Sequence, residues 1–263
     1  MLIYMVRLRV TAARLSEALM DTDRPWSLPE VTLGQAERVS ANAVLLAAGG
    51  SSADISWNEE DGGRGCRMVV RHDPKEALLP RQSPEESWRE AWPFLVVRLK
   101  SFLEGVALLE VPPLGGPDGA EVTLSAHFPV SPERLFAALT DPKELDAWIA
   151  DGAKVDLSPG GAYDYAWRQD GPAHVLAVDP NRTLETDWRF STAGAEGRVT
   201  WTVGPEDGGA RLTLVHHGFG ARHGNWPRDA YIWGWADFLQ ALALYLAGAG
   251  PADAWRGPVA AAK

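Results

Sequence analysis

The residues best suited to chemistry in this sequence are aromatic, and in its C-terminal half they recur at every second position. Tyr163, Tyr165 and Trp167 form one such row, and Trp188 and Trp201 lie in two others. Alternate residues of a β-strand point to the same face, so each row would line one wall of a sheet. Tyr and Trp carry polar atoms that need partners when buried, so a merely dry core would favour Leu, Ile and Phe. An aromatic wall with a few polar groups is the usual form of a site for a small apolar molecule.

Twelve residues make up the predicted ligand site. They come from the predicted sheet, from the helices beside it and from the segment after its last strand: Trp148, Tyr163, Tyr165, Trp167, Trp188, Trp201, His216, Phe219, Trp226, Trp235, Phe238 and Leu239. Each of them taken singly is more often core packing than ligand wall, and only the set as a whole favours a pocket. A register error of one residue would also turn a whole row to the other face of the sheet.

Several histidines raise the question of a metal site. His216 and His217 are adjacent, and His223 and Asp229 follow shortly after. Neighbouring residues of a strand point to opposite faces, so only one of the pair can join a common site, and no His or Cys stands at the spacing zinc requires. We therefore predict no metal, with one histidine facing the cavity as a hydrogen-bond donor to ligand and the other in solvent. His174 is a similar lone candidate.

Catalytic signatures are missing from the sequence. There is no GxSxG motif and no cysteine-centred motif, and Asp164 and Asp187 fall between the aromatic positions, which places them on the outer face. We predict no catalytic residue and no cofactor. An enzyme of the cyclase, aromatase or hydrolase kind remains an alternative, because catalysis by cavity shape and a few polar groups leaves no motif.

The composition limits the class of protein and its partners. Apolar residues make up 46% and charged residues 23% of the 263 positions, which is typical of a globular protein. The net charge of −10 disfavours binding to nucleic acid. The single Cys66 cannot form an intramolecular disulfide, and the start at Met1 shows no signal-peptide pattern, so we expect a cytoplasmic protein. No apolar stretch reaches the length of a membrane span, since Asp237 and Gln240 interrupt the longest one.

The chain repeats itself. Five residues near its start recur 120 positions later: Arg14, Leu15, Ala18, Leu19 and Asp21. A second set recurs at an offset of 143, pairing Trp92, Leu99, Phe102, Leu103 and Gly105 with Trp235, Leu242, Tyr245, Leu246 and Gly248. The difference of 23 residues predicts that the first copy lacks about two strands. We expect domains at 1–110 and 120–248, a linker at 111–119 rich in Pro and Gly, and a flexible tail at 249–263. The fused pair could imitate a homodimer, and self-association of the chain stays open.

Each copy is predicted to be a curved antiparallel sheet that grips a long C-terminal helix, an α+β fold. In the second copy, a strand at 122–128 leads to two short helices, the first of them capped by Ser131. A six-strand meander then covers 154–215, and a long apolar helix covers 229–246. The first copy shows strands near 43–47, 53–58 and 67–72, and its Trp57, Trp88, Trp92 and Phe94 could line a smaller cavity. Because a shortened sheet cannot arch far around a helix, we expect these four residues to serve packing instead.

The second copy resembles the START-like (SRPBCC, helix-grip) superfamily, and within it the homologues of the activator of heat-shock-protein-90 ATPase. The matching segments are 130–142, Trp148, 155–163, 211–214 and the Gly234-Trp235 start of the last helix. The resemblance implies an internal cavity between sheet and helix, and relatives that bind lipids, sterols, polyketides or other apolar molecules. The leading hypothesis is a carrier or sensor of a small hydrophobic molecule. A stress-related module that regulates a chaperone or transcription factor is a further alternative.

Overall fold

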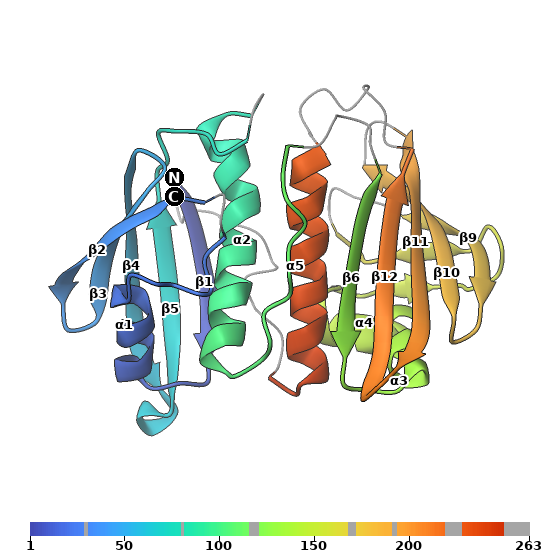
Figure 1. Ribbon diagram of the computed structural model, residues 1–263, viewed down its shortest axis with the longest axis horizontal. Helices are drawn as coiled ribbons and strands as arrows, with labels where there is room; N and C mark the ends of the chain where they lie inside the picture. The colour runs from blue at the N-terminus through green and yellow to red at the C-terminus, as the bar shows by residue number, and fades with distance from the viewer. Residues whose placement is uncertain are drawn as a thin grey trace. The chain divides into compact units, whose positions relative to one another are not determined.

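The protein consists of two compact units, which divide between Leu108 and Leu109. The computed structural model describes residues 1–28, 31–79, 82–115, 121–167, 172–190, 194–218 and 228–249. Each unit is one antiparallel sheet with a long helix at its C-terminal end (Figure 1). The predicted α+β fold with two tandem helix-grip domains is confirmed. In the described part of the chain, no helix combines the length and the apolarity needed to cross a membrane.

The first unit has five strands in the order β1-β5-β4-β3-β2. Its elements are β1 (Leu2–Leu8), α1 (Ala12–Met20), β2 (Leu33–Ser40), β3 (Ala43–Ala48), β4 (Ser51–Glu60), the short 3-10 helix η1 (Asp61–Gly63), β5 (Gly65–His72) and α2 (Pro84–Leu103). Strand β2 was not predicted from the sequence, because Gln35, Glu37, Arg38 and Ser40 give it no buried face; it is one of the two edge strands of the sheet. The four aromatic residues expected to serve packing, Trp57, Trp88, Trp92 and Phe94, are all buried.

Helix α2 contains a proline, Pro93, in its interior, and strand β1 compensates for it. Proline has no N–H, so the carbonyl oxygen of Arg89 loses its usual partner four residues further along the helix. The hydroxyl of Tyr4 in β1 donates a hydrogen bond of 3.2 Å to that oxygen. The helix begins with a capping box, in which Ser83 and Glu86 satisfy each other's backbone N–H groups. The Tyr4 bond therefore ties α2 to the first sheet, and the capping box fixes where the helix begins.

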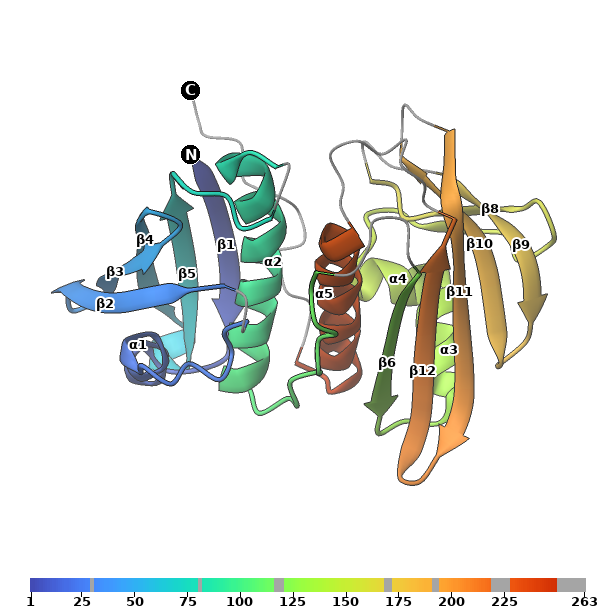
Figure 2. The same ribbon diagram turned by 45° about the horizontal axis from the view of Figure 1, so that its top comes forward.

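The second unit has seven strands in the order β6-β12-β11-β10-β9-β8-β7, two more than the first, as the lengths of the two copies predict. Its elements are β6 (Val122–Phe128), α3 (Pro132–Thr140), α4 (Pro142–Trp148), β7 (Lys154–Val155), β8 (Ala162–Asp164), β9 (Ala173–Asp179), β10 (Thr183–Phe190), β11 (Gly194–Glu206), β12 (Gly209–His217) and α5 (Arg228–Leu246). Ser131 caps α3 by accepting a hydrogen bond from the backbone N–H of Arg134, as predicted. In Figure 2, the strands from β12 to β9 follow one another across the sheet.

Helix α5 is gripped by much of this sheet. It contacts β6 at one edge, and its Trp235 ring contacts the rings of Trp188 in β10, Trp201 in β11 and His216 in β12. On the helix side, Phe238 meets the Trp148 ring of α4 at 5.8 Å between centroids. The core of the second unit therefore lies between the sheet and α5, and it is largely aromatic.

Two details of the predicted sheet are wrong. Strand β8 ends at Asp164 and does not continue to Trp167, because the Asp164 carboxylate accepts a hydrogen bond from the backbone N–H of Ala166, which takes a φ of +58°. The strand β10 contains a register shift between Asp187 and Arg189. Asp187, expected on the outer face, is only 7% exposed, and its carboxylate accepts hydrogen bonds from the backbone N–H and from Nδ1 of His174.

Leu109, which precedes the predicted linker, and Gly115 within the linker both form hydrogen bonds to α5. The backbone N–H of Leu109 donates to Oε1 of Gln240 at 2.9 Å, and that of Gly115 donates to both carboxylate oxygens of Asp229, at 3.2 and 3.0 Å. Both acceptors are buried residues of α5. Residues 116–120 lie outside the described part of the chain, as do residues 250–263 of the predicted tail.

Candidate functional site

Nine of the twelve predicted site residues form one continuous aromatic cluster between the sheet and α5. Ring centroids within the cluster lie 4.7 to 6.4 Å apart, and most of the pairs meet edge to face, the geometry that aromatic quadrupoles favour. The members are Trp148, Tyr163, Tyr165, Trp167, Trp188, Trp201, His216, Trp235 and Phe238. We call this set the aromatic cluster. Leu239 is buried on the same helix as Phe238, while Phe219 and Trp226 lie outside the described residues.

Two tyrosine hydroxyls lie deep in the aromatic cluster. The hydroxyl of Tyr163 donates a hydrogen bond of 2.6 Å to the carbonyl oxygen of Leu139 in α3, and the hydroxyl of Tyr165 donates to the Tyr163 oxygen at 3.3 Å. Burial raises the pKa of both phenols above the usual value of 10. Both side chains are therefore neutral at physiological pH. They supply hydrogen bonds, and neither can act as a base.

His216 has a defined tautomer. It is fully buried on β12, and its Nδ1 accepts a hydrogen bond of 3.1 Å from the indole N–H of Trp235. An accepting Nδ1 carries no proton, so in the neutral ring the proton is on Nε2, and His216 is a hydrogen-bond donor through that atom. Tyr231, one helical turn before Trp235, meets the His216 ring edge to face at 4.7 Å. Tyr231 was not predicted, although its i, i+4 spacing to Trp235 was a usable signal.

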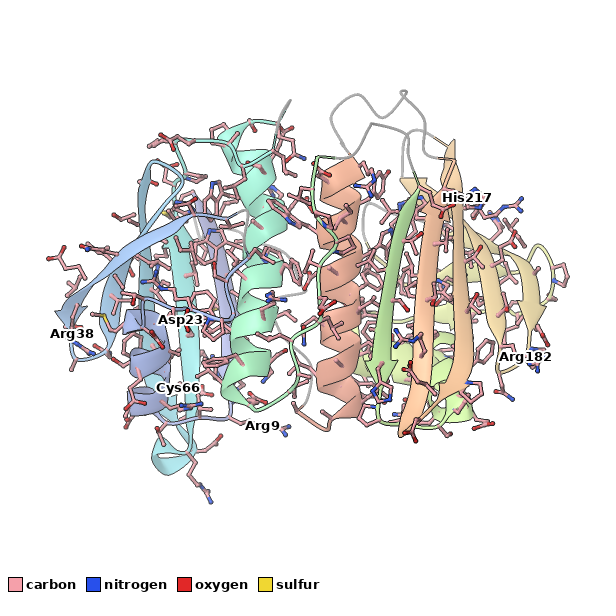
Figure 3. All side chains as sticks on the ribbon, in the orientation of Figure 1. Arg9, Asp23, Arg38, Cys66, Arg182 and His217 are labelled. Atoms are coloured by element: carbon pink, nitrogen blue, oxygen red, sulfur yellow. The ribbon has the colours of Figure 1, made fainter. Side chains whose placement is uncertain are left out.

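The remaining histidines do not join the aromatic cluster. His217 follows His216 on β12 but is exposed (Figure 3), so the two rings lie on opposite faces as predicted. His174 lies at the surface beside the Asp187 carboxylate. Among the described residues, no three His, Cys, Asp or Glu side chains are grouped so as to hold a metal ion. His223 lies outside the described part of the chain.

The aromatic cluster is not evenly covered. Trp148, Tyr163, Trp201 and Trp235 are each at most 3% exposed, and their indole or phenol groups are inside the unit. Trp167 and Trp188 are half-buried. The N–H of Trp167 donates to the carbonyl oxygen of Ile149 at 3.0 Å, and its ring stacks on Tyr165 at 4.7 Å with an angle of 17° between the planes. These two indoles are therefore the part of the cluster that a molecule arriving from outside can contact.

A family comparison accounts for this architecture. The family described as Activator of Hsp90 ATPase homolog 1-like protein matches residues 129–247, which run from the residue after β6 through α5 and contain the whole aromatic cluster. This part of the chain belongs to that family, and so to the START-like superfamily. Comparison with curated proteins gave no match.

Several solved structures are similar to about half of this chain. Protein MLL2253 from Mesorhizobium loti is 24% identical, with 49% of this chain and 98% of that chain covered and a TM-score of 0.42. Protein CV1439 from Chromobacterium violaceum is 26% identical over 47% of this chain and 95% of that chain, with a TM-score of 0.38. An AHSA1-like protein from Rhizobium etli is 24% identical over 50% of this chain and 84% of its own, with a TM-score of 0.41.

Proposed function

We propose that the second unit of this START-like protein binds a small apolar or aromatic molecule at its aromatic cluster, as a carrier or sensor. The observation that carries the proposal is the pair of half-buried indoles, Trp167 and Trp188, at the outside of an otherwise buried aromatic set. Covering these rings with a ligand would remove apolar surface from water, which is the main source of affinity for such molecules. The phenols of Tyr163 and Tyr165 are neutral hydrogen-bonding groups and not bases, which favours binding over acid–base catalysis.

The test uses the full-length protein and three probes of different shape: lauric acid, cholesterol and 1-naphthol. Binding is followed by the change in Trp fluorescence and by calorimetric titration, and native mass spectrometry of freshly purified protein looks for a copurified ligand. We expect at least one probe class to bind. Trp188→Leu should weaken this binding at least tenfold, because Trp188 is one of the two half-buried indoles of the aromatic cluster; circular dichroism checks that the variant is folded.

A matched control separates specific binding from general hydrophobic adhesion. Leu176 lies on β9 of the same sheet, is 38% exposed and has no part in the aromatic cluster. Leu176→Ala should leave binding unchanged. The proposal fails if none of the probes binds and the purified protein carries no ligand, or if both variants reduce binding equally.

A chaperone contact is the second candidate function, and the description of the matched family favours it. It predicts that the purified protein binds a 90-kDa heat-shock protein and raises its rate of ATP hydrolysis. The two functions are distinguishable, because Trp188→Leu should impair ligand binding and leave a surface contact with the chaperone intact.

A further inference from the structure

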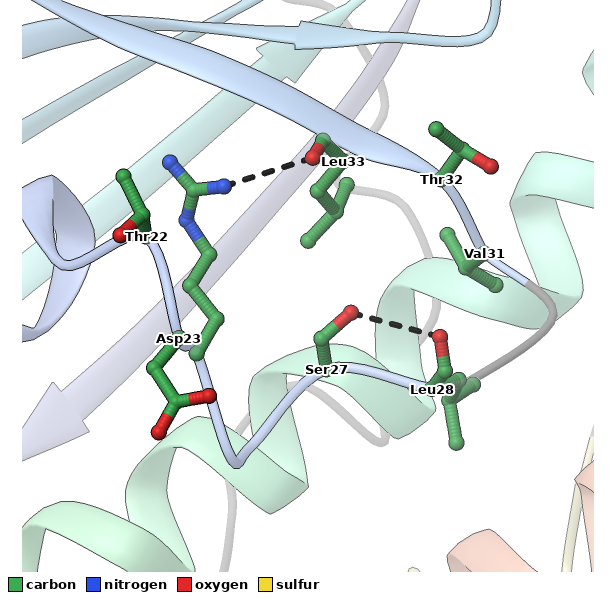
Figure 4. A pocket seen from close by; sticks show the side chains of 8 residues that line it. Thr22, Asp23, Ser27, Leu28, Val31, Thr32 and Leu33 are labelled. Atoms are coloured by element: carbon green, nitrogen blue, oxygen red, sulfur yellow. Dashed lines mark hydrogen bonds between the residues drawn. The ribbon is translucent and has the colours of Figure 1, made fainter.

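A cleft of about 350 Å³ opens in the first unit (Figure 4). It is formed by residues that follow α1 and by residues at and just before the start of β2. Its lining residues are Thr22, Asp23, Arg24, Ser27, Leu28, Val31, Thr32 and Leu33. Leu28 and Val31 are each 2% exposed and give the cleft an apolar base, while hydroxyl groups of Thr22, Ser27 and Thr32 lie around it.

Arg24 is the unusual member of this cleft. It is only 6% exposed, and its guanidinium donates to three neutral carbonyl oxygens: those of Gly34 at 2.8 Å, Leu33 at 3.4 Å and Leu19 at 3.4 Å. A guanidinium has five N–H bonds, so two of them are left without a protein acceptor, and the buried Nε is one of these. No carboxylate among the described residues forms an ion pair with Arg24.

A buried cation without a counter-ion is costly, and this one also has a strained backbone. Burial lowers the pKa of the Arg24 guanidinium, and the attraction of Asp21 offsets this only in part. The φ of Arg24 is +28°, a region that residues with a side chain rarely adopt. Such strain persists where the surrounding structure enforces it, and it is found most often at functional sites.

Neighbouring side chains fix the backbone on both sides of Arg24. Arg98 of α2 donates to the carbonyl oxygens of Trp26 at 3.1 Å and Pro25 at 3.5 Å. The indole N–H of Trp26 donates to the carbonyl oxygen of Ala18 in α1 at 3.2 Å. The segment that carries Arg24 is therefore fixed to both helices of the unit, and a ligand would meet a preorganised charge.

We propose that this cleft binds a small monocarboxylate whose apolar part rests on Leu28 and Val31 and whose charge faces Arg24. One guanidinium supplies one positive charge, and the exposed Asp23 carboxylate at the cleft repels ligands of higher charge. Both facts favour a carboxylate over a phosphate. The apolar base favours an aromatic or short aliphatic acid over acetate.

The test is a calorimetric titration of the full-length protein with benzoate and with benzamide, its neutral counterpart of the same shape, at constant ionic strength. We expect benzoate to bind the wild-type chain at least tenfold more tightly than benzamide. Arg24→Met should abolish that difference and leave benzamide binding unchanged, because the substitution removes the charge and keeps an apolar side chain of similar length.

A second variant supplies the counter-ion from the protein itself, and it decides the outcome if Arg24→Met does not fold. Thr32→Glu places a carboxylate in the cleft, so it should weaken benzoate binding at least tenfold and raise the melting temperature. Gln35→Glu adds the same charge three residues further along, at an exposed position of β2 that does not line the cleft, and it should do neither. Equal binding of benzoate and benzamide by the wild type, or equal benzoate binding by the two glutamate variants, would overturn the proposal.

Discussion

The indole N–H of Trp92 donates a hydrogen bond of 2.9 Å to Nδ1 of His72, joining α2 to the last strand of the first sheet. The second unit contains the same link, from Trp235 of α5 to His216 of β12. The two histidines also hold matching places in their sheets, since His72 lies opposite Leu2 and His216 opposite Val122 at the start of the first strand. The duplicated copies therefore keep a buried Trp–His pair that positions the long helix on the sheet.

Replacing either tryptophan of these pairs should destabilise its own unit. Trp92→Phe or Trp235→Phe keeps most of the apolar volume but leaves a buried imidazole nitrogen without its donor. The loss of a buried hydrogen-bond partner costs about 1–3 kcal/mol. Urea unfolding followed by circular dichroism measures the change in the free energy of unfolding.

Trp57 provides the control for that experiment. It is 1% exposed, and its indole N–H has no acceptor among the described residues. Trp57→Phe makes the same change of side chain without breaking a hydrogen bond, so it should cost less than Trp92→Phe. Equal destabilisation by the two variants would mean that ring volume, and not the Trp–His bond, accounts for the effect.

The stability of the first unit should fall with acid through His72. Burial is the largest cause that lowers the pKa of this imidazole, and Lys75 acts in the same direction, while the carbonyl oxygen of Ala48 and Asp73 oppose them. The folded-state pKa of His72 is below the unfolded value of about 6.5. At pH values between the two pKa values, the unfolded chain therefore binds more protons than the folded protein does. Stability is then fully present above pH 6.5 and declines as the pH falls toward the folded-state pKa, by up to about 1.4 kcal/mol per pH unit.

Urea unfolding between pH 7.5 and pH 5 measures this slope. His72→Gln keeps a hydrogen-bonding side chain but cannot titrate, so the slope of the first unit's transition should flatten in that variant. An unchanged slope would mean that groups other than His72 cause the acid sensitivity of the first unit.

The sequence predicted the architecture well because its signals were long and periodic. The aromatic rows, the Ser131 cap and the two offsets of the internal repeat placed the second sheet, its helices and the shorter first sheet. The signals that failed were local or tertiary. The turn at Ala166 depends on one side-chain oxygen of Asp164, and the buried carboxylate of Asp187 is paired with His174 of the neighbouring strand.

The candidate site could be predicted only in part from the sequence. Strand alternation brought Tyr163, Trp201 and His216 to one face, but how far each ring is covered depends on neighbouring elements that a periodic pattern does not describe. The Trp92–His72 pair was missed, although His72 precedes His216 by nearly the same offset that relates Trp92 to Trp235. The Arg24 cleft has no sequence signal, because it depends on an irregular segment between α1 and β2.

Two glycines of the second sheet should respond in opposite ways to alanine. A Cβ atom at Gly209 would lie 2.1 Å from the carbonyl oxygen of Phe128, next to the residue where the pairing of β12 with β6 begins. Gly209→Ala should therefore cost about 1–3 kcal/mol, as overpacking does. A Cβ atom at Gly204 of β11 meets nothing within 4 Å, so Gly204→Ala should be neutral or stabilise by about 0.5–1 kcal/mol through the lower entropy of the unfolded chain. Urea unfolding of both variants compares them directly, and a loss of stability in Gly204→Ala equal to that in Gly209→Ala would contradict the steric explanation.

The carboxylate of Asp229 should protect the segment around Gly115 from cleavage by a protease. Asp229 is 8% exposed, and it accepts the backbone N–H of Gly115 with both oxygens, so it ties the start of the predicted linker to the first turn of α5. A hydrogen bond to a charged group contributes about 1.5–3 kcal/mol, so Asp229→Ala should increase the population of the detached segment by about 10- to 100-fold.

Thermolysin cuts before bulky apolar residues such as Val111 and Leu114, and mass spectrometry of the fragments gives the rate of cleavage at these positions. Glu133→Ala is the matched control, because it removes an exposed acid from the first turn of α3 and leaves the Gly115 contact in place. Cleavage at the same rate in both variants would mean that the rest of the segment, including the bond from Leu109 to Gln240, holds it without Asp229.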